Sequence, residues 1–168
     1  DDFDEMERQA REITRWGDNV YVKIPVTNTL GESSEKVIRT LTRAGVKVNV
    51  TALLTLDQVR EVSAPLAGGA PACISVFAGR VADTGRDPVP LMAAAVELLR
   101  PYPNIELIWA SPRELLNVIQ ADAVGCHIIT ATNDILAKLR LVGKDLQEYS
   151  LDTVKMFRDD AVKAGFSL

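Results

Sequence analysis

The chain alternates between two kinds of segment, and this alternation limits the folds that it can adopt. Five short runs rich in β-branched residues lie near residues 20, 46, 72, 105 and 127: NVYVKIPVT, VKVNVTALL, ACISVFAG, IELIWAS and GCHIITAT. Polar breaks and apolar residues at helical spacing separate these runs. Regular β/α alternation is typical of a parallel sheet, either an open doubly wound sheet or a (β/α)8 barrel.

Capping residues predict where the helices begin. A hydroxyl residue followed three positions later by Gln or Glu, the capping-box spacing, occurs at Thr55 and at Ser111, where Pro112 would take the first helical position. Asp87 and Pro88 predict the start of another helix. An opening amphipathic helix is predicted by apolar residues at three- and four-residue steps behind two aspartates: Phe3, Met6, Ala10 and Ile13.

The two faces of the predicted strands differ, and the difference favours the barrel. Alternate residues of the first three runs form a mixed and polar set: Tyr21, Lys23, Pro25 and Thr27, then Asn49 and Thr51, then Ser75 and Phe77. The residues between them are aliphatic. A doubly wound sheet covers both faces with helices, whereas a barrel turns one face to a closed interior where polar groups can meet. No G-x-G-x-x-G motif follows the first strand, so a dinucleotide site has no support.

Composition narrows the classes of partner. The 168 residues carry a net charge of −4 and no run of Lys or Arg, which argues against nucleic acid or an anionic membrane. The longest apolar stretches are too short to span a membrane, and no signal-peptide pattern opens the sequence, so we expect a cytoplasmic protein. Cys73 and Cys126 lie in apolar runs and are predicted to be reduced core residues. His127, the single histidine, is predicted to be structural, with no metal site or cofactor.

Lys23 is the unusual residue of the first strand, because it stands inside an apolar run. Structural lysines that snorkel or form ion pairs outnumber catalytic ones, so one interpretation is purely structural. The other is a Schiff-base lysine, whose pKa must fall from about 10.4 so that a neutral amine can attack a carbonyl. A buried position inside a barrel would supply the necessary desolvation.

Four segments together resemble the transaldolase family. They are VYVKIPVT, VNVTALLT, SVFAGRVAD and WASPREL, in this order and spacing, and the similarity runs from Asp1 to Leu168. The small single-domain transaldolases and the related fructose-6-phosphate aldolases are the most similar members. The resemblance implies a (β/α)8 TIM barrel, of which this chain supplies the last five βα units, with Lys23 as the nucleophile that forms an imine.

The resemblance also implies roles for other residues on the polar strand face. Thr51 would hold a water used in proton transfer, and Asn49 would hydrogen-bond the sugar, whereas the residues alone favour a satisfied polar pair in the barrel interior. Ser75 and Phe77 match substrate-contacting positions of the family's sixth strand. Phe77 stands where transaldolases carry Phe and the fructose-6-phosphate aldolases carry Tyr, which favours the transaldolase because only a tyrosine hydroxyl can act in acid/base chemistry.

Two arginines match the family's phosphate-binding positions. Arg80 follows the third strand run and Arg113 follows the fourth, beside Ser111. Guanidinium groups suit phosphate, and a helix beginning at Pro112 would also turn its free N–H groups toward an anion. Taken singly, such an arginine is more often a surface or ion-paired residue, and a serine like Ser111 more often only a helix cap; together, at the ends of adjacent strands, they point to a phosphorylated substrate.

The chain departs from the family at its beginning, because three strands of the family pattern, including the one with an acid/base glutamate, would precede Asp1. A (β/α)8 domain typically needs about 250 residues. We therefore expect residues 1–168 to be a single barrel domain that is truncated at its N-terminus; the alternative is a fragment that pairs its edge strands with another chain.

The sequence thus predicts a class I, metal-independent transaldolase of the pentose phosphate pathway, acting on phosphorylated sugars. The alternatives are a fructose-6-phosphate aldolase and a non-catalytic sugar-phosphate-binding or assembly subunit. Family resemblance further predicts a homo-oligomer formed through a C-terminal helix, with Val154, Phe157 and Ala161 as the docking face.

Overall fold

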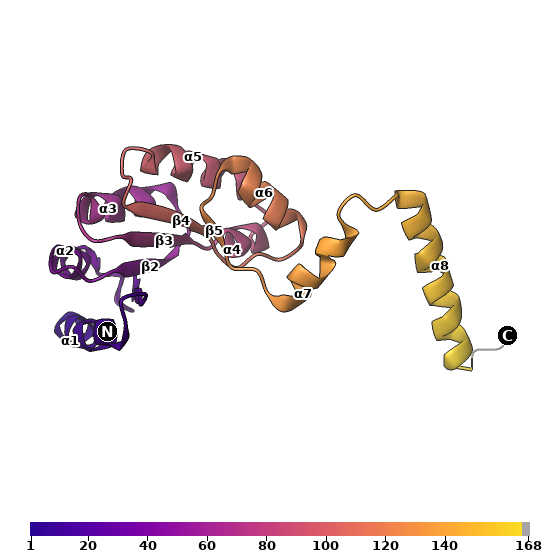
Figure 1. The fold of residues 1–168 in the computed structure, drawn as a ribbon, viewed down its shortest axis with the longest axis horizontal. Helices are drawn as coiled ribbons and strands as arrows, with labels where there is room; N and C mark the ends of the chain where they lie inside the picture. Colours follow the sequence, from indigo (N-terminus) through magenta and orange to yellow (C-terminus); the bar gives the residue numbers. More distant parts are fainter. Residues whose placement is uncertain (166–168) are drawn as a thin grey trace. The chain divides into compact units, whose positions relative to one another are not determined.

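The computed structural model describes residues 1–165, which fall into two compact units, Asp1–Thr132 and the residues from Asn133 onward. The first unit alternates strands and helices (Figure 1). Its elements are α1 (Phe3–Ile13), η1 (Thr14–Trp16), β1 (Val22–Pro25), α2 (Glu35–Arg43), β2 (Val48–Leu53), α3 (Leu56–Leu66), β3 (Ala72–Val76), α4 (Ala78–Asp83), α5 (Val89–Leu99), β4 (Ile105–Trp109), α6 (Leu116–Val124) and β5 (Ile128–Ile129).

The five strands form one parallel sheet in the order β1-β2-β3-β4-β5. Each strand therefore pairs with the strand before it along the chain. A doubly wound sheet reverses its strand order at a switch point, and no reversal occurs here. Consecutive parallel order is what part of a (β/α)8 barrel has, so the fold is an α/β arrangement consistent with a partial barrel.

One face of the sheet is the main hydrophobic core, as the strand alternation predicts. Val22, Val48, Ile74 and Leu107 of the four longer strands are 3% exposed or less and pack with buried residues of the helices. Trp109, fully buried, belongs to the same cluster. Because α1, α2, α3, α5 and α6 all contribute buried or partly buried residues to this cluster, the helices cover this one face of the sheet.

The opposite face is built from the other alternate residues of the strands. It holds a separate small cluster of Cys73, Ile108 and Ala110, with Phe77 packed against it. Polar residues of β1 to β3 extend this face on one side of the cluster. The predicted contrast between an aliphatic and a mixed face is confirmed.

Several predicted helix starts are confirmed by their caps. Thr55 accepts a hydrogen bond from Gln58 N, and the Gln58 side chain accepts one from Thr55 N, which completes the predicted capping box. Asp87 accepts from Val89 N at the start of α5. Asp2 caps α1 by accepting from Glu5 N at 2.7 Å.

The second unit consists of helices. It contains α7 (Asn133–Ala137), η2 (Lys138–Leu141) and α8 (Leu146–Lys163), and α8 is capped by the Asp145 side chain. Val154 and Phe157, two residues of the predicted docking face, are 59% and 63% exposed in the chain. The end of the predicted C-terminal segment, 166–168, lies outside the described residues.

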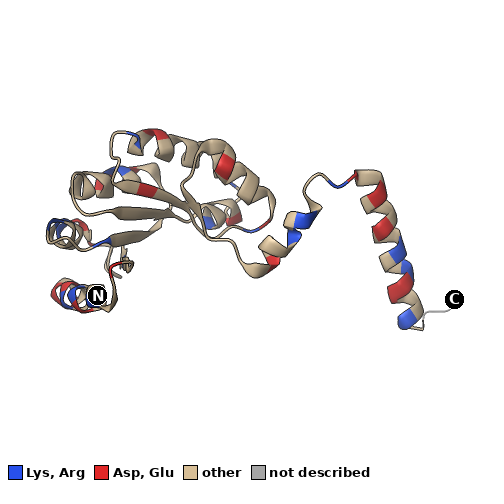
Figure 2. Ribbon diagram, in the orientation of Figure 1, with Lys and Arg blue, Asp and Glu red and all other residues tan. Residues whose placement is uncertain are grey.

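Charged residues gather on the helices, whereas the strands are mostly uncharged (Figure 2). Within residues 1–165, no helix combines the length and the apolar character needed to cross a membrane.

Candidate functional site

The predicted site residues of the strands lie on the polar face of the sheet. Lys23 of β1 is in register with Asn49 of β2, and Asn49 is in register with Cys73 of β3. The Ser75 hydroxyl donates to Asn49 Oδ1 at 2.8 Å, so the two side chains connect β2 to β3. Because parallel strands place their carboxyl ends at one edge, the residues after β3 and β4 reach the same end of this face.

Lys23 is exposed, and the expectation of a buried lysine is wrong for the chain as described. Its neighbours in the strand, Val22 and Ile24, are each 3% exposed, because they point into the main core instead. Among residues 1–165, the Lys23 ammonium has neither a hydrogen bond nor an ion pair. The structure therefore gives no ion-pair partner of the kind that a structural lysine would have.

Thr51 differs from Lys23 in being buried, at 8% exposed. Its Oγ1 atom has no hydrogen-bond partner among the described residues. A buried hydroxyl without a partner is costly, and an ordered water is a common way to satisfy it. Within residues 1–165, the Thr51 hydroxyl thus lacks a partner that an ordered water would supply.

The backbone next to Thr51 is irregular. The register of β2 against β3 shifts between Val50 and Leu53, and Ala52 has a φ of 66°. A non-glycine residue in the left-handed region is strained, and such strain occurs often at functional sites. The irregularity brings Leu53 into the main core together with Val48 and Val50, although regular alternation would place Leu53 on the same face as Thr51.

The small apolar cluster on the polar strand face contains the thiol of Cys73. Cys73 lies beside Glu106 of β4, with Sγ 4.0 Å from Oε2. Burial, and to a smaller extent the Glu106 charge, raises the pKa of Cys73 to about 11. The thiol therefore stays protonated near neutral pH and acts as a small packing residue rather than as a nucleophile.

Arg80 lies in the short helix α4, directly after the third strand. Its guanidinium carbon is 5.6 Å from the centroid of the Phe77 ring, a cation–π distance. The side chain is exposed and has no hydrogen bond to the described residues. Phe77 thus supports the arginine from one side, and the donors of the guanidinium remain available to a ligand.

The predicted helix start at Ser111 is wrong. The helix begins later, with α6 at Leu116, so Arg113 lies in the loop between β4 and α6 rather than in a first helical turn. Ser111 has a φ of 57°, and Asn117 Oδ1 instead accepts from the backbone N–H groups of Arg113 and Glu114. The argument that a helix N-terminus at Arg113 favours an anion does not hold.

A close backbone approach explains the conformation of this loop. A Cβ atom on Gly79 would lie 1.5 Å from the carbonyl oxygen of Ser111, so only glycine fits there. Gly79 N also donates to the Ala110 oxygen, and Ser111 N donates to Thr130 Oγ1. The start of α4, which carries Arg80, is therefore held against the loop that carries Arg113.

Asp83, at the end of α4, forms an ion pair with Arg113. Arg113 Nε donates to Asp83 Oδ1 at 3.0 Å, and one terminal nitrogen donates to Oδ2. These hydrogen bonds, with smaller contributions from the charges of Arg113 and Arg80, hold the pKa of Asp83 below its usual value. In turn, Asp83 raises the pKa of Arg113, so the pair stays ionised.

Sequence reasoning missed Gly79, Asp83 and Asn117. Asp83 has one local signal, since it follows Arg80 by three residues and α4 places it one turn further along. Gly79 stands between two residues of interest in the F-x-G-R turn, but its role depends on a contact with Ser111, far away in sequence. Asn117 caps the loop from inside a helix, where no capping pattern predicts it.

His127 and Cys126 interact with the backbone and the hydrophobic core rather than with the polar strand face. His127 Nδ1 accepts the Leu107 N–H at 3.0 Å, which extends the pairing of β4 with the last strand. Cys126 is partly buried against the main core, and burial raises its pKa to about 11. Among residues 1–165, no group of three His, Cys, Asp or Glu side chains is arranged to hold a metal ion.

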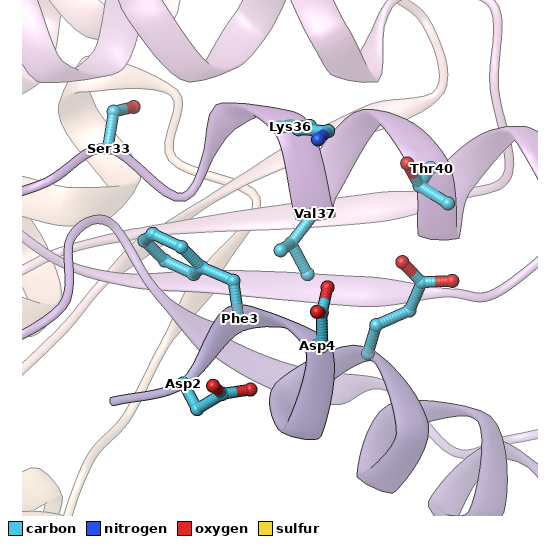
Figure 3. A pocket seen from close by; sticks show the side chains of 8 residues that line it. Asp2, Phe3, Asp4, Ser33, Lys36, Val37 and Thr40 are labelled. Atoms are coloured by element: carbon cyan, nitrogen blue, oxygen red, sulfur yellow. The ribbon is translucent and has the colours of Figure 1, made fainter.

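One surface hollow contains no predicted site residue. It is a groove of about 330 Å³ between α1 and α2, lined on one side by Asp2 and Asp4 and on the other by Lys36 and Val37. Figure 3 shows these side chains projecting from the two helices. The groove lies between helices, whereas the polar strand face bears Lys23 and Thr51, so the two places are separate.

A scan against protein families matches residues 1–168 to the family described as Transaldolase/Fructose-6-phosphate aldolase. Several curated proteins are similar along most of the chain. A probable transaldolase of Thermoanaerobacter sp. (strain X514) is 32% identical over 170 residues, covering 100% of this chain and 72% of the relative.

Two further relatives give the same picture. Probable transaldolase 2 of Listeria monocytogenes is 36% identical over 81% of the chain, and a probable transaldolase of Methanococcus maripaludis (strain C5) is 34% identical over 82%. The matched regions are 59% and 61% of these relatives. The chain thus spans between about three fifths and three quarters of the lengths of the three proteins.

Proposed function

The chain belongs to the transaldolase/fructose-6-phosphate aldolase family. We propose that it functions as a transaldolase, with Lys23 as the Schiff-base nucleophile. The enzyme would transfer a dihydroxyacetone unit from a ketose phosphate to an aldose phosphate. The observation that carries the proposal is a lysine without an ion-pair partner in the described residues, placed on a polar strand face in register with Asn49. No organic cofactor is part of the proposal, because an iminium is itself an electron sink.

The first half of the reaction forms and uses this iminium. The neutral Lys23 Nζ attacks the C2 carbonyl carbon of the ketose phosphate, and loss of water from the carbinolamine gives the iminium. A base removes the C4 hydroxyl proton, the C3–C4 bond breaks, and its electron pair moves into the iminium as an enamine. Aldose phosphate leaves, and the three-carbon enamine remains on Lys23.

Thr51 is the residue of this chain that we assign to proton transfer. Its buried Oγ1, without a partner in residues 1–165, can orient a water that takes the C4 hydroxyl proton. Asn49 and Ser75, already joined by a hydrogen bond, would bind sugar hydroxyls. Phe77 shapes the pocket beside them and supports Arg80.

The second half is the reverse addition. The enamine carbon attacks the carbonyl of an acceptor aldose phosphate, and hydrolysis of the new iminium frees Lys23. Arg80 and Arg113, on two adjoining segments after β3 and β4, would bind the phosphate of each substrate, with Ser111 beside Arg113. The choice of sugar phosphate would depend on how these three residues bind the phosphate.

A second enzymatic function is fructose-6-phosphate aldolase, which the family description also names. Such an enzyme would release free dihydroxyacetone after the first half. Phe77 favours the transaldolase, because a phenylalanine ring cannot protonate the enamine. An assay for dihydroxyacetone from fructose 6-phosphate without any acceptor distinguishes the two.

Further parts of the proposal rest on family resemblance. We propose that residues 1–168 belong to a single (β/α)8 domain, that the protein is a cytoplasmic homo-oligomer, and that its sugar phosphates belong to the pentose phosphate pathway. The exposure of Val154 and Phe157 on α8 supports a docking role for this helix. Light scattering tests the oligomer, and a monomeric mass contradicts it.

Mass spectrometry after borohydride trapping tests the central proposal. The protein is incubated with fructose 6-phosphate, reduced and digested, and we expect an adduct on Lys23. Lys47 is a matched control, because it lies before the neighbouring strand and its Nζ is held by the Asp18 carbonyl. Trapping should therefore be lost in Lys23→Met and kept in Lys47→Met.

The absence of an adduct on the folded wild-type protein would contradict the imine chemistry. Calorimetry with sugar phosphates then decides what is left. Binding without an adduct would favour the non-catalytic sugar-phosphate-binding subunit, an alternative supported by the exposure of Lys23 in the described residues.

A further inference from the structure

We propose that Asp83 is a positioning residue that holds the Arg113 guanidinium in the orientation that binds a substrate phosphate. The inference rests on the proposed function, in which Arg80 and Arg113 bind that phosphate. The Asp83 carboxylate would then lie next to a bound phosphate of the same charge. The geometry of the ion pair, rather than its charge, carries the argument.

The pairing uses one edge of the guanidinium. Arg113 donates to Asp83 through Nε and one terminal nitrogen, one bond to each carboxylate oxygen. A guanidinium has five N–H donors in a planar fork, so this pairing leaves the edge formed by the two terminal nitrogens unused. Among residues 1–165, no other side chain hydrogen-bonds the Arg113 guanidinium. A phosphate can take that second edge while Asp83 keeps the first.

The position of Asp83 also connects the two arginines. Asp83 ends the helix that carries Arg80, and the Arg80 charge contributes to lowering its pKa. The Gly79 contact with Ser111 fixes this helix against the loop of Arg113. Asp83 therefore sets where one arginine points relative to the element that carries the other.

Stability alone does not account for this pair. The Arg113 and Asp83 side chains are 47% and 52% exposed, and exposed ion pairs contribute little to the free energy of unfolding. Within residues 1–132, the other ion pairs join residues of one helix or its end, three or four positions apart. Arg113–Asp83 instead joins the segments after β3 and β4, the two segments assigned to phosphate.

The opposing effect is electrostatic repulsion between Asp83 and the bound phosphate. Solvent screens charges at such an exposed site, whereas a freed arginine side chain must lose its rotamer freedom each time a phosphate binds. We therefore expect removal of the carboxylate to weaken phosphate binding. If repulsion were the larger effect, removal would strengthen it, so the sign of the change is decisive.

Titration calorimetry with glucitol 6-phosphate tests the inference, because this hexitol phosphate has no carbonyl and cannot form an imine. We expect Asp83→Ala to weaken binding about tenfold relative to the wild-type chain. Asp83→Asn, which keeps an acceptor oxygen, should fall between the two. The control is Asp57→Ala, which removes a similar aspartate–arginine pair, Asp57–Arg60, from the surface of α3; its affinity should equal that of the wild type.

Unphosphorylated ligand and thermal melting separate positioning from folding. Dihydroxyacetone trapping on Lys23 should be the same in the wild type, Asp83→Ala and Asp83→Asn, and the melting temperature should change only slightly, because an exposed ion pair contributes little to stability. Equal losses with dihydroxyacetone and glucitol 6-phosphate would make Asp83 a general structural residue and overturn the inference. Unchanged or tighter binding of glucitol 6-phosphate in Asp83→Ala would also overturn it.

The same measurements distinguish this inference from the proposed function. If the wild-type chain binds glucitol 6-phosphate in an Asp83-dependent way but forms no adduct with fructose 6-phosphate, the imine chemistry fails and the inference holds. If it forms the dihydroxyacetone adduct but does not bind glucitol 6-phosphate, the imine chemistry holds and the inference fails.

Discussion

The two faces of the sheet differ in burial and in the polarity of their side chains. On the aliphatic face, Val48, Ile74 and Leu107 are fully buried against helices. The other face holds an exposed lysine, a hydrogen-bonded Asn49–Ser75 pair, a buried Thr51 hydroxyl with no partner among residues 1–165, and a few apolar residues. The first face stabilises the fold, and the second carries the groups suited to chemistry. Substitutions that change one property without the other test this division.

The largest expected effect is on the chemistry of the polar face. Lys23→Met removes the amine, so we expect no trapped adduct at all, since no other group can replace a nucleophile that forms an imine. Because Lys23 is exposed and forms no ion pair within residues 1–165, its urea unfolding midpoint should match that of the wild type. A large loss of stability in Lys23→Met would instead make the lysine structural.

Adjacent residues of β3 offer the sharpest test of stability. Ile74→Ala empties a fully buried position in the main core and should cost about 2–5 kcal/mol of unfolding free energy. Ser75→Ala removes one hydrogen bond to Asn49 and should cost about 1 kcal/mol. Equilibrium urea unfolding of both variants measures the difference. Equal costs would mean that the two faces are packed alike.

The two cysteines make the free energy of unfolding depend on alkaline pH. Burial raises the pKa of Cys73, on the polar face, and of Cys126, against the main core, to about 11. When the pKa of a thiol is higher in the folded than in the unfolded protein, the protonated thiol stabilises the fold. This contribution is fully present below the unfolded-state pKa and is lost as pH rises through the folded-state pKa. We expect losses between about pH 9 and 11, on the order of 2 kcal/mol for each thiol.

Variants assign these losses to the two thiols. Cys73→Ala and Cys126→Ala should each flatten part of the pH dependence of the urea midpoint. Glu106→Gln should lower the pKa of Cys73, which the Glu106 charge helps to raise, and leave that of Cys126 unchanged. A pH dependence that survives in the double cysteine variant would point to other groups.

The smallest expected effect concerns Asp83. Its pKa is lowered chiefly by hydrogen bonds from Arg113, so the stability it contributes is present above the unfolded pKa, near 3.9, and is lost as pH falls through the folded value. The side chain is half exposed, so the acid-side loss should be small. Comparing urea midpoints of wild type and Asp83→Asn from pH 5 downward measures it; identical curves would mean that the pair is absent in solution.

Local patterns predicted the fold better than they predicted the site. Period-two alternation identified the two faces of the strands, because side-chain direction in a strand depends only on position. The capping box at Thr55 joins two residues only three positions apart, Thr55 and Gln58, so local spacing could predict it. The same spacing at Ser111 failed, since contact with Gly79 and a hydrogen bond to Thr130 hold the residue at a positive φ.

Long-range contacts explain what sequence reasoning could not supply. The Arg113–Asp83 pair joins residues 30 apart, and no local spacing indicates it. Lys23 was expected to be buried because a barrel interior would enclose the polar strand face, but the five described strands form an open sheet that leaves Lys23 exposed. Resemblance to a family named the site residues, whereas the contacts among them came from the structure.

The consecutive strand order has a consequence for the kinetics of folding. Within residues 1–165 each strand pairs with its neighbours along the chain, so each of these pairings closes a single crossover. A chain emerging from the ribosome can therefore add βα units in the order of synthesis. At each stage the last strand presents an unpaired edge, and the delay before the next unit arrives sets how long the nascent chain is exposed to aggregation.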